Sequence, residues 1–194
     1  MRVFLAVPGD ADWCASALAF GARWRATLPP ASWTKPESWH LTLRFLGEIG
    51  EEAAVRFGDA FGAGAEAPDV ALPPGGPVVF PPHGRPRVVG VGFAPGAGLE
   101  ALAGVARAAE RAARSIGCAP EERPWRPHVT LARLREPWGR GAVEAFREAA
   151  GGWPFPEWRV RSVVLYSSRL DPSGAVHTAL REWPVAAEAR GKTA

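Results

Sequence analysis

The sequence is poor in residues that mark several common protein classes. Its two cysteines, Cys14 and Cys118, lie far apart and belong to no metal-type cluster. A disulfide framework is therefore not expected, which fits a reducing compartment. The apolar run 2–7 is ended by Pro8 and Gly9, too early for a signal peptide or a membrane span, and no later run is long enough. These absences predict a cytoplasmic protein with no membrane segment.

Lysine is also scarce, since only Lys35 and Lys192 occur among the 23 basic residues. The remainder are arginines, whose planar fork matches phosphate geometry and makes an anionic partner plausible. A GC-rich codon bias would enrich Ala, Gly, Pro and Arg as well, so the net charge of +3 decides little. Only four histidines occur, and they are too widely spaced to suggest a metal site. We expect no metal and no cofactor.

The length of 194 residues and the hydrophobic content of 47% are typical of one globular domain. We expect that domain to span residues 1–186, followed by a flexible tail over 187–194. Hydrophobic periodicity and turn signals predict strands at 2–7, 40–46, 78–80, 87–93, 128–134, 159–167 and 175–183, with a short one near Val70. Helices are predicted from Asp10 or Asp12 to about Leu28, and at 51–61, 99–116 and 141–150.

The order of these elements contains a repeat. A strand–helix–strand–helix–strand pattern occurs around WHLTLRFL and again around RPHVTLARL, without the regular spacing of a doubly wound sheet. The repeat suggests two similar lobes, each giving one strand to a shared cleft.

Each of these two strands carries the tripeptide His-x-Thr followed by leucine. The first is His40-Leu41-Thr42-Leu43, and the second is His128-Val129-Thr130-Leu131. Successive side chains on a strand point to opposite faces, so His and Thr share one face while the aliphatic residues anchor the other. From the abundance of threonine, two such tripeptides by accident have odds of roughly half a percent. The repeat therefore indicates function.

The two tripeptides suit chemistry at a phosphate. Histidine has an unperturbed pKa near ~6.5, so His40 and His128 can act as base and acid for an in-line displacement. The hydroxyls of Thr42 and Thr130 can donate to non-bridging phosphate oxygens. A strained cyclic phosphodiester is already activated, so this chemistry needs no metal. The residues do not decide which histidine is the acid.

The paired motifs resemble the two-histidine phosphoesterase superfamily, and in particular its RNA 2′,3′-cyclic phosphodiesterases, also called 2′-5′ RNA ligases. The resemblance covers nearly the whole chain, through RVFLAVP, WHLTLRFLGE, FPPHGRPRVVGVGF, RPHVTLARL and VVLYSSRL. It implies that His40 and His128 are the catalytic acid and base, that Thr42 and Thr130 bind phosphate, and that Arg133 helps to hold phosphate or RNA. It also implies a bilobal α+β fold, with antiparallel sheets flanking a central cleft and helices outside.

The chain departs from the family pattern at two places. His177 stands where a tyrosine is frequent, and Gly90 stands where a tryptophan is frequent. We expect His177 to be structural or exposed, and His83 to be a solvated loop residue. Because strand alternation places Phe45 with Leu43, we expect it to be buried.

Three further residues beside the motifs are weaker candidates. Most of the nine tryptophans are expected in the core, but Trp39 and Trp125 flank the motifs and could stack on a base. Arg126 could contact phosphate or form a surface ion pair.

The sequence thus predicts a metal-independent enzyme that hydrolyses RNA 2′,3′-cyclic phosphates to 2′-phosphomonoesters, with weak reverse 2′-5′ ligation. Its partner would be RNA or a nucleotide with that end, and its state a monomer. A phosphodiesterase for small cyclic nucleotides or ADP-ribose cyclic phosphate would use the same four residues. A non-catalytic RNA- or nucleotide-binding module would not require two titrating groups.

Overall fold

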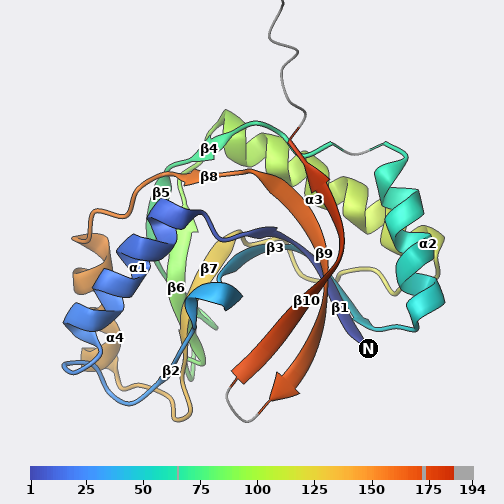
Figure 1. Cartoon of the computed structure of the whole chain (residues 1–194). Helices are drawn as coiled ribbons and strands as arrows, with labels where there is room; N and C mark the ends of the chain where they lie inside the picture. Colours follow the sequence, from blue (N-terminus) through green and yellow to red (C-terminus); the bar gives the residue numbers. More distant parts are fainter. Residues whose placement is uncertain (65, 172–173, 186–194) are drawn as a thin grey trace, which may run out of the picture.

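The computed structural model describes residues 1–64, 66–171 and 174–185 (Figure 1). The expected tail and the middle of the DPSG turn lie outside these residues. The helices are α1 (Ala11–Trp24), η1 (Pro36–Ser38, a 3-10 turn), α2 (Glu51–Gly62), α3 (Ala97–Ser115) and α4 (Arg140–Gly151). The strands are β1 (Arg2–Pro8), β2 (Ser32–Trp33), β3 (His40–Glu48), β4 (Ala71–Leu72), β5 (Pro74–Phe80), β6 (Val88–Phe93), β7 (His128–Arg133), β8 (Trp158–Arg159), β9 (Ser162–Asp171) and β10 (Gly174–Pro184).

The predicted elements are present with several shifted boundaries, such as β5, which begins at Pro74 rather than at residue 78, while β2 and η1 were not predicted. Helix α1 begins after Asp10, whose side chain accepts a hydrogen bond from the Trp13 amide, but it ends at Trp24. The strand expected at 159–167 begins only at Ser162. Residues Trp158 and Arg159 pair instead with β4, with Trp158 opposite Leu72, and the Trp158 side chain is fully buried.

Antiparallel pairing joins the main strands in the order β10-β9-β1-β3-β7-β6-β5, with β2 beside β7. The first half of this path, β10 to β3, and the second half, β7 to β5, meet through one residue pair, Leu41 with Val129. The two predicted sheets are therefore two halves of one sheet. The bilobal α+β architecture is confirmed.

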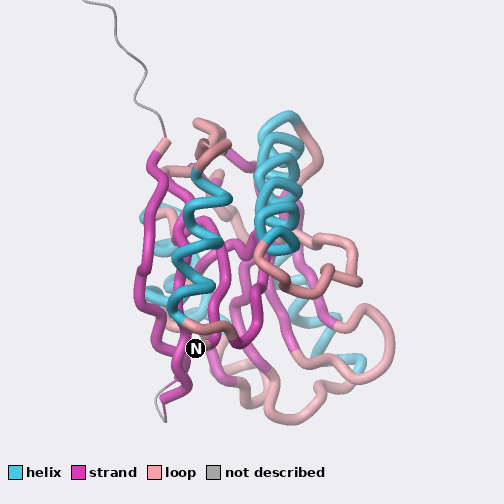
Figure 2. The backbone as a smooth tube through the Cα atoms, turned by 90° about the vertical axis from the view of Figure 1, so that its right-hand side faces the viewer, coloured by secondary structure: helices cyan, strands magenta, loops and turns pink. Residues whose placement is uncertain are grey.

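The helices cover the outside of the two halves. Helices α2 and α3 lie beside the first half, and α1 and α4 beside the second (Figure 1). Figure 2 shows the helices outside the layer of strands. Phe20 of α1 meets Phe146 of α4 with ring centroids 6.3 Å apart, while Glu110 of α3 reaches Arg44 of β3.

The aliphatic residues of both motifs enter the core as predicted. Leu41, Leu43, Val129 and Leu131 are all buried against the helices, which leaves the opposite strand face to His and Thr. Trp13 is a centre of the neighbouring aromatic packing, with ring centroids 5.9, 5.3 and 5.1 Å from those of Trp39, Phe155 and Trp158.

The prediction for Phe45 is wrong, because a β-bulge interrupts the alternation. Strand β1 pairs with Thr42 and then Arg44, skipping Leu43, so that Leu43 and Arg44 are both buried. Phe45 consequently faces the same side as His40 and is half-buried. The buried guanidinium of Arg44 is paired with Glu110, with its Nε 2.6 Å from the carboxylate oxygen, and its NH2 group donates to the carbonyl of Ala119.

Strand β7 contains the matching bulge. Strand β6 pairs with Thr130 and then Ala132, skipping Leu131, and both Leu131 and Ala132 are buried. The two motifs thus share their backbone irregularity as well as their residues.

Gly90 lies opposite Thr130 beside this second bulge. A Cβ atom at Gly90 would overlap the carbonyl oxygen of Val129, so the bulge leaves no room for a side chain. We expect Gly90→Ala to lower the free energy of unfolding by about 1–3 kcal/mol.

A matched control is Gly104→Ala in α3, where the nearest atom would be 3.8 Å from the new Cβ. This helical site should gain about 0.5–1 kcal/mol. Urea denaturation followed by circular dichroism measures both, and equal stability of the two variants would contradict the close approach at Gly90.

Candidate active site

The Leu41–Val129 pair brings the two motifs side by side. Since β3 and β7 are antiparallel, His40 lies toward Thr130 and His128 lies toward Thr42. All four of these side chains are half-buried on the face opposite the aliphatic core. The arrangement relates the two motifs by an approximate two-fold axis through the pair.

Each imidazole is oriented by a backbone carbonyl two residues earlier. Nδ1 of His40 is 2.8 Å from the carbonyl oxygen of Ser38, and Nδ1 of His128 is 2.7 Å from that of Arg126. A carbonyl oxygen can only accept, so Nδ1 carries the proton in both rings. The Nε2 atoms are therefore the nitrogens that can accept or donate a further proton.

Each histidine also packs against a phenylalanine. The ring of Phe4 lies 4.8 Å from that of His40, and the ring of Phe80 lies 4.6 Å from that of His128. Sequence reasoning did not identify these two residues, because their contacts join strands that are distant in sequence.

Burial lowers the pKa of both histidines. It lowers the pKa of His40 to about 4, with repulsion from His177, Arg133 and His128 acting in the same direction and the bond to Ser38 acting against it. Burial, followed by repulsion from Arg133, also lowers the pKa of His128. Both rings are thus predominantly neutral at pH 7 in the free protein.

Arg133 reaches this site through the second bulge. It stands five residues after His128, a spacing that would place it on the core face of a regular strand. The bulge at Leu131 restores it to the histidine face, where it is exposed. Its charge lowers the pKa values of His40, His128 and His177, which places it in the field of all three rings.

His177 is a further member of the site that sequence reasoning undervalued. Its ring centroid lies 5.3 Å from that of His40 and 5.0 Å from that of Phe4. Burial, and then repulsion from Arg133, lowers the pKa of His177. In the sequence, the only sign of this role was that position 177 has a histidine where the family frequently has a tyrosine.

Known proteins resemble this chain over most of its length. The profile described as LigT like phosphoesterase matches residues 18–90 and 93–177. The chain is a member of the LigT-like phosphoesterase family. Proteins named RNA 2′,3′-cyclic phosphodiesterase are similar to it: that of Aeropyrum pernix is 32% identical over 161 residues, covering 83% of this chain and 90% of the relative. That of Thermus thermophilus is 36% identical over 166 residues, covering 79% and 75%.

Solved structures show the same architecture. TT0787 of Thermus thermophilus is similar with a TM-score of 0.73 and 28% identity, covering 97% of this chain and 100% of that one. The fold also matches that of Escherichia coli LigT in its apo form, with a TM-score of 0.74 at 22% identity, covering 95% and 96%.

The four remaining candidate residues of this LigT-like phosphoesterase differ in exposure. His83 is exposed in its loop, as expected, and Trp39 is buried in the core. The Trp125 indole is half-buried and donates to the Thr42 carbonyl at 2.8 Å, so it supports β3 directly. Arg126 is exposed, and no carboxylate in the described chain forms an ion pair with it.

The thiols of this LigT-like phosphoesterase play no part in the site. Cys14 and Cys118 are both free and half-buried. Burial, reinforced by Asp10, raises the pKa of the Cys14 thiol to about 11, which keeps it protonated and unreactive at neutral pH.

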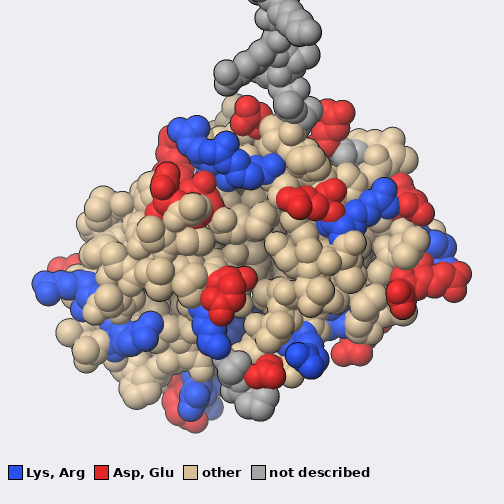
Figure 3. All heavy atoms as spheres, in the orientation of Figure 1, with Lys and Arg blue, Asp and Glu red and all other residues tan. Residues whose placement is uncertain are grey.

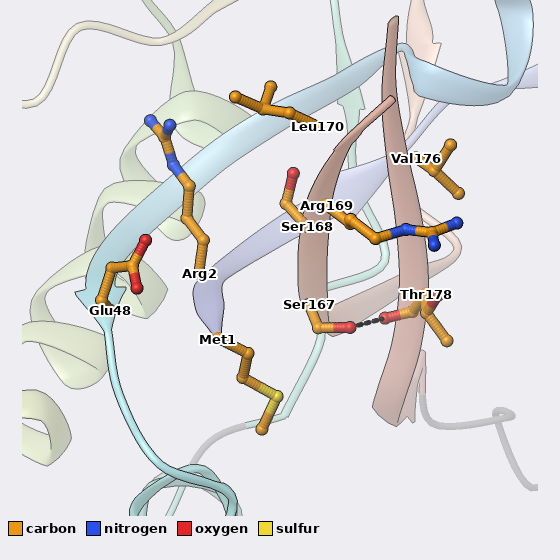
Figure 4. Close-up of a pocket in the computed structure, with 9 residues that line it drawn as sticks. All are labelled: Met1, Arg2, Glu48, Ser167, Ser168, Arg169, Leu170, Val176 and Thr178. Atoms are coloured by element: carbon orange, nitrogen blue, oxygen red, sulfur yellow. Dashed lines mark hydrogen bonds between the residues drawn. The ribbon is translucent and has the colours of Figure 1, made fainter. Parts of the chain in front are cut away.

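A hollow of about 560 Å³ lies against β1, β9 and β10 of this LigT-like phosphoesterase (Figure 4). It is lined by Met1, Arg2, Glu48, Ser167, Ser168, Arg169, Leu170, Val176 and Thr178. With no imidazole among these residues, it is separate from the acid–base pair.

Acidic and basic residues are interspersed over the view in Figure 3. In the described residues no group of three or more His, Cys, Asp and Glu could hold a metal ion. None of the described helices has the length and apolar character that crossing a membrane requires.

The position of Arg133 leads to a titration test. Removing its charge in Arg133→Gln should raise the pKa values of His40, His128 and His177, since one repulsive cation is lost. Arg133→Lys, which keeps the charge, should leave them close to the wild-type values. NMR titration of the imidazole protons measures all three.

Arg135→Gln provides a control in the same segment, because its Nε bonds instead to the Ser32 hydroxyl at 3.3 Å. Equal histidine shifts in Arg133→Gln and Arg135→Gln would mean that Arg133 does not face the site.

Proposed function

We propose that this chain hydrolyses the 2′,3′-cyclic phosphate at RNA ends to a 2′-phosphomonoester, with His40 and His128 as the acid–base pair. The observation that carries the proposal is the juxtaposition, across the Leu41–Val129 pair, of two imidazoles whose Nδ1 atoms are held by carbonyls, which leaves Nε2 for proton transfer. Membership of the family and the names of its relatives support the same substrate class.

The reaction is an in-line displacement at phosphorus. One Nε2 takes a proton from water as the water oxygen forms its bond to phosphorus. The other histidine, protonated beforehand, gives its proton to O3′ as the P–O3′ bond breaks. The product carries a 2′-phosphate and a free 3′-hydroxyl, and proton exchange with solvent restores both rings.

Thr42, Thr130 and Arg133 are the proposed phosphate ligands. The two hydroxyls donate to the non-bridging oxygens, and the guanidinium offsets the charge that grows on them. A 5′-hydroxyl in place of water would form a 2′-5′ linkage by the same proton transfers, and we propose this as a weak second activity. The scheme uses no metal and no cofactor.

We further propose that the protein acts as a cytoplasmic monomer on RNA or a nucleotide that carries this end. The free, half-buried thiols support a reducing compartment. Light scattering on the purified protein measures the oligomeric state.

The direct test is turnover of a short RNA ending in 2′,3′-cyclic phosphate, with EDTA present and the 2′- and 3′-phosphate products resolved. We expect 2′-phosphate from the wild type and a loss of about 10²–10⁴-fold in kcat for His40→Ala and for His128→Ala. His83→Ala, which removes an exposed loop histidine, should retain full activity.

Other results would replace the proposal. Tight nucleotide binding without turnover would indicate a binding module, and activity only with added metal would exclude the acid–base scheme. Higher kcat/KM on small cyclic nucleotides or ADP-ribose cyclic phosphate would make one of those the substrate.

The lowered pKa values set the expected pH profile. Activity requires one neutral and one protonated histidine. As pH falls below the pKa of His40, which is about 4, His40 becomes protonated as well as His128, and kcat/KM declines. As pH rises above the pKa of His128, which lies below its ordinary 6.5, both rings become neutral and kcat/KM declines again. We therefore expect a bell with its maximum below pH 6.5, and a maximum above pH 7 would contradict this account.

A further inference from the structure

His177 approaches His40 although the two strands that carry them are not neighbours. Strand β10 is separated from β3 by β9 and β1. The β9–β10 hairpin curves past β1, and the hydroxyl of Ser38 in η1 donates to the carbonyl of Ala175 at 3.2 Å (Figure 1). This curvature brings the His177 and His40 rings edge to face, with an interplanar angle of 88°.

We propose that His177 is a positioning residue for His40. It holds the His40 ring against Phe4 and disfavours protonation of His40 at Nε2. The proposal rests on the function proposed above for His40. It adds a third imidazole to the pair supplied by the two motifs.

The ring contacts support the proposed effect of His177 on the orientation of His40. Phe4 contacts both histidines, with its ring 4.8 Å from that of His40 and 5.0 Å from that of His177. His40 is thus enclosed by Phe4 and His177 while the Ser38 carbonyl fixes its Nδ1. These contacts restrict rotation of the ring and keep Nε2 in one direction.

Electrostatic repulsion supports the proposed effect of His177 on the protonation of His40. Two imidazolium ions at this separation repel each other, so a positively charged His177 ring disfavours the imidazolium form of His40. The pKa of His40 is lowered by this repulsion as well as by burial. Nδ1 of His177 is buried without a hydrogen-bond partner in the described chain, and the ring packs against Phe4 and His40.

Arg133 and His128 also repel a proton on His40, and His177 is the titratable group whose ring contacts that of His40. The charged or titratable groups that act on or face the two rings from neighbouring strands are Arg133 and His128 of β7 and Tyr166 of β9, which itself lies near Glu182 of β10. The ring packed on His128 is Phe80, which carries no charge. The two motifs therefore differ in their ring contacts, because a titratable ring packs on His40 and none of the printed ring contacts of His128 is titratable.

The test combines NMR titration with pH–rate profiles of His177→Phe, which keeps an aromatic ring and removes the charge. We expect the pKa of His40 to rise by about 0.5–2 pH units, from the Coulomb repulsion of two charges at this distance. The acid limb of kcat/KM should move up by the same amount, while the titration of His128 stays unchanged. His177→Ala should give the same shift and also lower kcat, because the ring contact is lost.

Tyr166→Phe is the matched control, since its ring lies 6.2 Å from that of His177 and the change removes only a hydroxyl. It should leave unchanged the pKa of His40 and both the acid and the alkaline limb of the kcat/KM profile. An unchanged His40 pKa in His177→Phe would overturn the proposal, whether activity then falls equally at every pH or only KM changes. Because titration needs no turnover, it tests His177 even if the RNA assay fails.

Discussion

The antiparallel pairing of Leu41 with Val129 is the contact on which the site depends. It is the single residue pair between β3 and β7 in the part of the chain described. Side chains alternate on both strands, so this pair turns both histidines and both threonines to the same side while it buries the aliphatic residues. A slip of one residue in either strand would bury its polar residues and expose its anchors.

The bulges that follow in β3 and β7 make the two motifs alike in backbone and unlike in chemistry. Each inserts a second buried residue, which returns the side chain at the fifth position after histidine to the polar face. That side chain is Phe45 in β3 and Arg133 in β7. One wall of the site is consequently aromatic, with the Arg2 guanidinium 4.6 Å from the Phe45 ring centroid, and the other presents an open cation.

The sequence was sufficient for the features that depend on local pattern. Period-two alternation correctly predicted that Leu41 and Val129 would be buried, and turn residues and periodicity located most helices and strands. The resemblance of the two motifs gave the bilobal fold. Alternation failed at Phe45, because a bulge is created by the register between strands and leaves no mark in the strand that contains it.

The partners of the histidines could not be predicted for a related reason. Phe4, Phe80 and His177 reach them through curvature of the whole sheet, which brings together residues from strands that are not neighbours. Curvature of this kind arises from the packing of helices and strands over long range, and no short segment encodes it. The position of His177 was visible only as a departure from a familiar pattern.

The path of the chain also has a consequence for folding. Strand β1 belongs to the first half but leads into α1, which packs with α4 beside the second, and β6 of the second half leads into α3, which packs on β3. Neither half is a continuous piece of polypeptide, so detaching one would strip the core from the other. The two halves must therefore unfold as one cooperative unit. A site that needs a wall from each half is then lost all at once on heating, rather than one wall at a time.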